Sequence, residues 1–226
     1  MPNRPYKFFE AFLNTFPPTS VFTGDTPNEM MASKKDEEGW FEWRLIKGSF
    51  AEEDYEKVAN DFGVKFPKSF VQWHKEYFFL DADISIVRLP ASNPNLPLAD
   101  IRQQLDYLGA GQLISKQLYP FGSEGNDAGP LVFDGRVAAP DNEFPVRYYD
   151  HEFDGEVEGL SEIIFSSFGK LLECVTHYMV QLKTRRNYEI IPDFFSIDPS
   201  GAGLTGIDYW SGWIAMQKEI FEEFGD

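Results

Sequence analysis

The apolar residues of this 226-residue chain fall into short segments of two different spacings, and this mixture most constrains the fold. Some segments repeat an apolar residue every three or four positions, as amphipathic helices do, and others alternate or are β-branched, as strands do. Loops rich in Gly, Pro, Asn and Asp separate them. Because 42% of the residues are hydrophobic and 22 are Phe, the chain can bury a real core. We therefore predict a single α+β core with extensions at one or both ends.

Several segments carry helix signals. Ser49 and Glu52 have the spacing of a capping box, and helical periodicity continues to Gly63, which favours a left-handed C-cap. Pro67 opens a second predicted helix, whose apolar face extends to Phe78. Ser166 or Ser167 is expected to cap a later helix built on Phe168, Leu171, Leu172, Val175 and Met179. Further helices are predicted at 8–13, 98–108 and 210–224.

Alternating or β-branched segments predict strands at 40–46, 84–89, 118–121, 131–133, 146–149 and 162–165. The first of these is a candidate to join the main sheet. The Gly-rich stretch 122–129 lacks the Gly-Lys-Ser/Thr ending of a phosphate-binding loop and contains two acids. We therefore predict a hairpin turn there.

We divide the chain into an N-terminal extension at 1–48, a core domain at 49–183 and a C-terminal extension at 184–226. The C-terminal extension contains a flexible Gly-rich link at 199–206 and ends in an amphipathic helix. The longest strongly apolar run, Tyr77 to Leu80, is far below the roughly 20 residues needed to cross a bilayer. Charged and polar residues interrupt the apolar residues near the N-terminus, unlike a secretory signal. We expect a cytoplasmic protein without a membrane association.

Residues with catalytic or metal-binding potential are few. The single cysteine, Cys174, lies in an apolar helical pattern, which predicts a buried hydrophobic residue. The alternative is a catalytic thiolate, because His177 at i+3 on the same helix could serve as its base. His74 and His177 lie on apolar helical faces, and we interpret both as satisfied core histidines. The three histidines, His74, His151 and His177, have no metal-binding spacing, and no G-x-S-x-G motif is present. We expect no cofactor, no metal and no enzyme activity. The alternative is an enzyme or small-ligand protein with a cleft near Asp134, Asp150 and His151.

Acidic charge is the most informative bulk property. The chain has 37 acidic and 20 basic residues, a net charge of -17, which disfavours direct binding to nucleic acid or to anionic lipid. The span 124–158 holds ten acids against Arg136 and Arg147, so it carries -8. This charge either keeps the surface solvated or meets a basic protein partner. The candidate partner-binding residues are Glu124, Asp127, Asp134, Asp150, Glu152, Asp154 and Glu156.

Five short motifs follow one another along the chain in an order that can be compared with known families. Phe62-Gly-Val64 is followed by Phe66-Pro67 at the start of a helix, then by 118–122 (LYPFG), 131–134 (LVFD) and 165–168 (FSSF). In this order the motifs resemble the SUKH superfamily, which includes fungal cell-wall-assembly regulators and bacterial immunity proteins. The resemblance covers 49–183. One departure is that a Gly commonly follows the second helix in that family, whereas this chain runs YFFLDAD at 77–83.

The resemblance implies one antiparallel-rich sheet flanked by helices, acting as a protein-binding module without catalytic residues. It further implies that Gly63, Pro67, Gly122 and Asp134 serve the fold. Many such bacterial domains are immunity proteins that neutralise a toxin, often a nuclease, whose cationic surface would suit an acidic inhibitor. A regulatory scaffold protein, self-associating through the C-terminal helix with its two Trp, is a further alternative.

Overall fold

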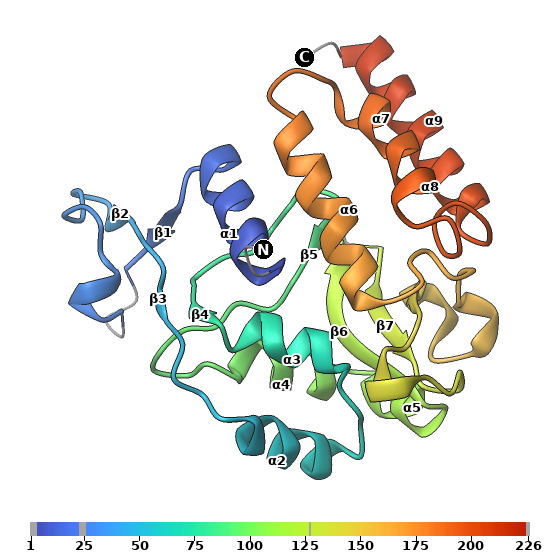
Figure 1. Cartoon of the computed structure of the whole chain (residues 1–226), viewed down its shortest axis with the longest axis horizontal. Helices are drawn as coiled ribbons and strands as arrows, with labels where there is room; N and C mark the ends of the chain where they lie inside the picture. The colour runs from blue at the N-terminus through green and yellow to red at the C-terminus, as the bar shows by residue number, and fades with distance from the viewer. Residues whose placement is uncertain (1–3, 23–25, 127, 225–226) are drawn as a thin grey trace.

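Antiparallel strands from the middle of the chain pair into a four-stranded sheet of order β5-β6-β7-β8 (Figure 1). The structure is a computed structural model that describes residues 4–22, 26–126 and 128–224. The strands of this sheet are β5 Val87–Arg88, β6 Leu118–Glu124, β7 Pro130–Asp134 and β8 Val146–Tyr148. The α+β class is confirmed, and so is the predicted hairpin, because β6 and β7 are antiparallel neighbours.

The expectation of a single sheet is wrong for the described residues. Two small antiparallel sheets lie outside the four-stranded one. One pairs β1 Thr19–Val21 with β2 Trp40–Glu42, and the other pairs β3 Ile46–Lys47 with β4 Tyr77–Phe78. The predicted strand at 40–46 is therefore split between these two sheets and does not join the main one.

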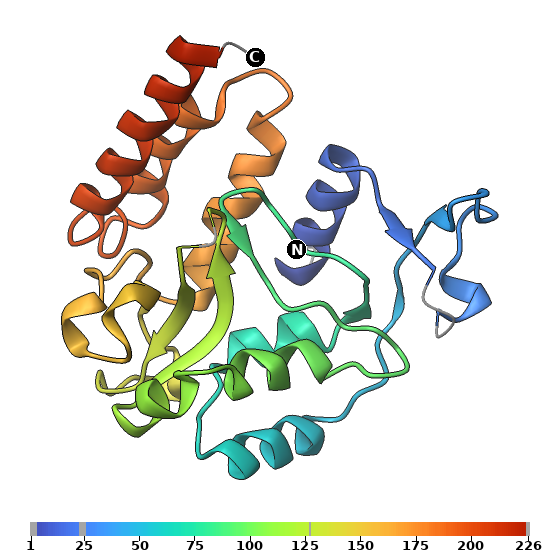
Figure 2. The same cartoon turned by 180° about the vertical axis from the view of Figure 1, so that it is seen from behind.

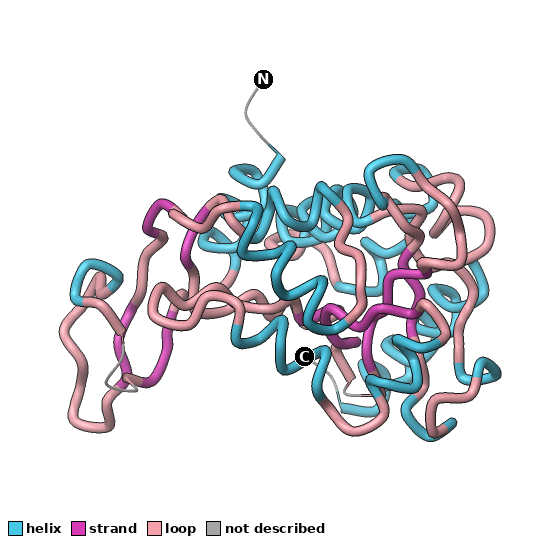
Figure 3. Tube along the Cα trace, turned by 90° about the horizontal axis from the view of Figure 1, so that it is seen from below, coloured by secondary structure: helices cyan, strands magenta, loops and turns pink. Residues whose placement is uncertain are grey.

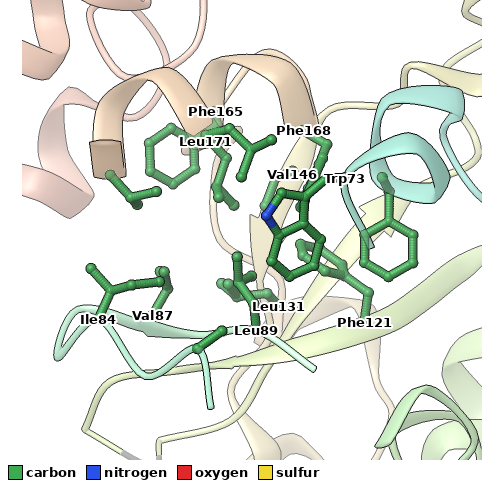
Figure 4. Packing of buried hydrophobic residues seen from close by; sticks show 14 of the residues in the cluster. Trp73, Ile84, Val87, Leu89, Phe121, Leu131, Val146, Phe165, Phe168 and Leu171 are labelled. Atoms are coloured by element: carbon green, nitrogen blue, oxygen red, sulfur yellow. The ribbon is translucent and has the colours of Figure 1, made fainter. Parts of the chain in front are cut away.

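Strand β7 is buried along its whole length because both faces of the sheet are covered. Leu131 and Phe133 point into the main core, where Phe133 stacks on Phe121 with ring centroids 3.8 Å apart. Trp73, Phe121 and Phe168 come together there from a helix, a strand and a second helix (Figure 4). Val132 points to the opposite face, as expected from the two-residue period of a strand, and joins a second small cluster.

The central helices are α2 Glu52–Phe62, α3 Lys68–His74, α4 Ala99–Asp106, α5 Ala110–Ser115 and α6 Phe168–Gln181. Two predicted caps are confirmed: Gly63 is left-handed with φ 68°, and the Ser167 hydroxyl accepts a hydrogen bond from the Lys170 amide at 3.2 Å. The predicted capping box at Ser49 is wrong. Helix α2 begins after Ala51, whose amide donates to Asp54 at 3.1 Å, and Glu52 pairs instead with Lys75.

Other predicted elements are shorter than expected. Helix α3 ends at His74, because 77–78 pairs with β3 instead of continuing the helix. The helix predicted to reach Leu108 ends at Asp106, and α5 follows it without having been predicted. Only 87–88 of the strand predicted at 84–89 is regular, and 162–165 contributes a single bridge from Phe165 to Val146.

The N-terminal segment folds back onto the core. In α1 Arg4–Thr15, Phe8, Phe9 and Phe12 are buried and belong to the same cluster as Trp73 and Phe168. After α1 the chain leaves the core as an arm that carries β1, β2 and the short 3₁₀ helix η1 Asn28–Met30 (Figure 3).

The C-terminal segment also packs on the core, where its short helices contact α6 and its last helix lies beside those short helices (Figure 2). Its elements are α7 Asn187–Ile190, η5 Ile191–Asp193, α8 Phe194–Ile197 and α9 Ile207–Phe224. Trp210 of α9 is buried, and its indole Nε1 donates to the Ile164 carbonyl at 3.1 Å. The predicted link 199–206 is an ordered turn in which Gly201 and Ala202 are buried. Both end segments thus share one buried cluster with 49–183.

Within the described ranges, no helix combines the length and the apolar character that a bilayer crossing requires.

Candidate functional site

The strongest concentration of exposed acids follows β8 directly. Residues 150–158 contain five acids and no Lys or Arg, and we call them the acidic segment. Two single-turn 3₁₀ helices shape it: η3 His151–Phe153 and η4 Val157–Gly159. The Asp150 side chain caps η3 by accepting from the Glu152 amide at 3.0 Å. The exposed acids are Glu152, Asp154, Glu156 and Glu158.

Backbone contacts hold the acidic segment in place. The Asp150 amide donates to the Gly159 carbonyl at 2.8 Å, which closes the segment on itself. Lys116, the residue after α5, places its Nζ 2.7 Å from the Gly155 carbonyl and 3.1 Å from Glu156 Oε2. Gly155 has φ 85°, and a Cβ there would lie 2.0 Å from Gln112 Oε1. A glycine at this position therefore allows the segment to approach α5 closely.

Different carboxylates of the acidic segment raise the pKa of Tyr148 and of Tyr149. Burial raises the pKa of Tyr148 to about 12, with further contributions from the charges of Asp150, Glu124 and Glu152. Burial also raises the pKa of Tyr149; the Gly155 backbone amide partly opposes this, and the charges of Glu156, Asp154 and Asp150 add to it. Tyr148 packs against the main core and Tyr149 belongs to the second cluster, so the two phenols lie on opposite faces of the sheet, and the charge of Asp150 contributes at both.

Two predicted partner-binding residues are buried. Only 4% of Glu124 is exposed, and its carboxylate accepts from the amide and the side-chain Nδ2 of Asn126 at 2.6 and 2.9 Å. Only 1% of Asp134 is exposed, and it accepts from Arg136 Nε and Arg147 Nε, both at 2.7 Å. Burial by itself raises the pKa of Asp134, but the two guanidinium groups outweigh it and lower that pKa.

Glu124 and Asp134 therefore do not belong to an exposed binding face in this structure. Their carboxylates accept hydrogen bonds from Asn126, Arg136 and Arg147 within the chain. Asp127 lies outside the described residues. The structure places Asp150, Glu152, Asp154 and Glu156 together, and it adds Glu158 to them.

A pocket of about 790 Å³ lies between α4, α5, the β6–β7 hairpin and the acidic segment. At the hairpin end, Gly129 passes so close to β8 that a Cβ would lie 2.0 Å from the Tyr149 carbonyl oxygen. The lining residues are mostly apolar or neutral: Gln103, Gln104, Tyr107, Leu108, Gly109, Gln112, Leu113, Ser123, Gly129, Pro130, Tyr149, His151, Asp154 and Gly155.

The sequence did not reveal the α4–α5 wall of this pocket. The sequence does contain the polar residues of this wall, three Gln and a Tyr within 103–112. However, α5 was not predicted, and without this helix nothing indicates that these side chains face the same pocket. Leu108 is fully exposed at the turn between the two helices, where a continuous helix would have placed it inside.

The alternative cleft near Asp134, Asp150 and His151 is realised only in part. His151 lines the pocket, whereas neither of the two aspartates does. Among the described residues, no three His, Cys, Asp or Glu side chains come together as a metal site would require.

The remaining reactive side chains have structural partners. Burial raises the pKa of the Cys174 thiol strongly, which disfavours the thiolate. His177 Nε2 lies 2.7 Å from Asp193 Oδ2, so it is half-buried and paired rather than a core histidine. The prediction for His74 as a satisfied core histidine is confirmed by its contacts with Tyr55 Oη and the Ala91 carbonyl.

No family model, no curated protein and no solved structure matches this chain.

Proposed function

We propose that this chain is a non-catalytic binding module that recognises a cationic protein surface through the acidic segment. The observation that carries the proposal is that residues 150–158 hold five acids and no Lys or Arg, and that four of these acids, Glu152, Asp154, Glu156 and Glu158, are exposed. Like charges held this close repel one another and destabilise the fold slightly, and a cationic partner relieves that repulsion.

The acidic segment also exposes two apolar side chains between its acids. Phe153 is 44% exposed and Val157 is 41% exposed, and both alternate with the acids along the segment. Protein interfaces commonly combine apolar groups at their centre with a polar rim. The acids would then accelerate association, while Phe153 and Val157 would slow dissociation.

The partner we favour is a toxin, and the role we favour is that of a cytoplasmic immunity protein. The motif order shared with the SUKH superfamily supports this role. A nuclease that grips phosphates has a cationic surface, and a rigid acidic segment would cover such a surface. The scaffold alternative has less support, because Trp210 and Trp213 of α9 are buried against the chain's own core.

The test is a matched capture from the native cell at low salt. One matrix carries the wild-type chain, and the second carries the acidic variant, Glu152→Lys, Asp154→Asn and Glu158→Lys. Asn is used at Asp154 because that residue has φ 47°, which Asn tolerates. The third matrix carries a control with the same charge change on exposed acids elsewhere, Glu37→Lys, Glu38→Gln and Glu219→Lys.

The proposal predicts a basic protein that the wild-type and control matrices retain and the acidic variant loses. Retention of the same proteins by all three matrices would refute the acidic segment as the binding surface.

A further inference from the structure

The pocket beside the acidic segment is lined by an acidic side chain and by neutral ones. Although the chain has 20 Lys and Arg, none of them is among the described residues that line it. Asp154 supplies a carboxylate, and His151 is the other titratable group of the rim apart from two tyrosines. The nearby acids of the segment add to the negative potential, so the pocket favours a cation over an anion.

Neutral acceptors line the same pocket as this carboxylate. Gln103 and Gln104 come from α4, Gln112 comes from α5, and Ser123 comes from β6. Amide and hydroxyl oxygens on several walls suit a donor group that points in several directions at once. An arginine guanidinium has five N–H donors in a planar fork, whereas a lysine ammonium is a compact point charge.

Tyrosine rings add a second feature that suits a guanidinium. Tyr107 is partly exposed on the α4 side, and burial, followed by the neighbouring Tyr149, raises its pKa to about 12. It therefore stays neutral near pH 7 and can offer its ring face to a flat cation. Tyr149 is 2% exposed, and its hydroxyl makes no hydrogen bond of normal geometry within the described part of the chain.

The Gly155 amide lies near the Tyr149 hydroxyl without a well-formed hydrogen bond, and a buried hydroxyl left in that state costs up to about 1–3 kcal/mol, which a group that reaches it would remove. The volume, about 790 Å³, falls in the range of ligand sites and exceeds what one side chain fills. The pocket thus has room for a side chain together with the peptide that carries it.

We propose that this pocket receives an arginine side chain from the cationic partner, with Asp154 as its carboxylate and Tyr107 beneath the guanidinium plane. This inference rests on the proposed function, since it names which residue of the partner the surface selects. In this proposal the acidic segment attracts the partner at long range, and the pocket binds one arginine side chain once the two surfaces are in contact.

The test uses N-acetyl-arginine amide as a probe, titrated into the ¹⁵N-labelled chain at low salt and followed by backbone amide shifts. Weak binding is expected, with shifts at Gly109, Gly129 and Gly155, which line the pocket. The corresponding lysine amide should bind at least about threefold more weakly, because it lacks the fork of donors. Asp154→Asn should weaken arginine binding by about threefold or more, whereas Glu219→Gln, at an exposed acid outside the acidic segment and the pocket, should change it by less than about twofold.

Shifts confined to Glu152, Glu156 and Glu158, or equal binding of the two probes, would overturn the arginine pocket. So would the absence of any shift. The matched capture judges the acidic surface separately, so the pocket can fail while the proposed function stands.

Discussion

Asp198 and Ser166 lie 32 residues apart in the sequence and are joined by two hydrogen bonds. The Ser166 amide donates to Asp198 Oδ2 at 2.7 Å, and its hydroxyl donates to Oδ1 at 2.6 Å. The Gly201 amide donates to the same carboxylate at 3.2 Å, and Asp198 is fully buried. This carboxylate fastens the turn before α9 to the residues that begin α6.

Replacing Asp198 should therefore loosen the whole C-terminal segment. Asp198→Ala leaves buried N–H groups without an acceptor, and we expect the free energy of unfolding to fall by about 3 kcal/mol. Urea denaturation followed by tryptophan fluorescence measures this. Glu219→Ala, an exposed site on α9, is the control and should change stability by less than about 0.5 kcal/mol. Equal stability of the two variants would show that the turn does not depend on Asp198.

Trp210 gives a second test of how α9 is held. Trp210→Ala removes a buried ring that packs against Phe165 and Phe194, and it should lower the free energy of unfolding by about 4 kcal/mol. Met216→Ala, at a site of the same helix where the side chain is 36% exposed, should cost less than about 1 kcal/mol. If α9 instead drives self-association, Trp210→Ala would lower the solution mass of the native protein; we expect no change in that mass.

His74 should make stability depend on pH. It is fully buried, and burial lowers its pKa from 6.5 to about 4, so the folded chain keeps it neutral. Between these values the unfolded chain binds the proton and the folded chain does not. The free energy of unfolding should therefore fall as the pH drops from about 6.5 to about 4, by on the order of 3 kcal/mol.

The variant His74→Gln separates this effect from other titrations. Its stability at neutral pH will be lower, but it should lose less stability than the wild type between about pH 7 and about pH 4.5. Denaturation curves at several pH values give the two slopes. Parallel slopes would mean that His74 takes up its proton in the folded state.

Asp134 should prove structural rather than partner-binding. Asp134→Ala leaves Arg136 and Arg147 without their shared acceptor, and we expect a loss of about 3 kcal/mol, moderated because both guanidinium groups reach solvent. At a temperature where the variant is folded, its affinity for the partner should stay within about twofold of the wild type. A loss of affinity without a loss of stability would instead show that Asp134 contributes to partner binding.

Local signals in the sequence predicted the local parts of this fold. The Gly63 cap, the Ser167 cap and the β6–β7 hairpin each depend on a few neighbouring residues, and all three are confirmed. The end of α3 was missed because Tyr77 and Phe78 pair with β3, some thirty residues earlier, and periodicity does not report such a partner.

The candidate site was predicted unevenly for the same reason. The run of acids at 150–158 is local, so its shared exposure followed from composition. The fate of Asp134 depends on strand register, which places Arg147 of β8 opposite Val132 and within reach of the carboxylate. The pocket forms only where α4, α5 and the β6–β7 hairpin come together, so no local sequence pattern predicts it.

The central claim is that the acidic segment steers a cationic partner onto this chain. The direct measurement is the association rate constant with the captured partner, by stopped flow at low and at high salt, for the wild type, the acidic variant and the charge-matched control. The account predicts at least a tenfold slower association for the acidic variant at low salt, a smaller difference at high salt, and a near-normal rate for the control. Equal slowing of the variant and the control would contradict it, because net charge rather than this segment would then govern binding.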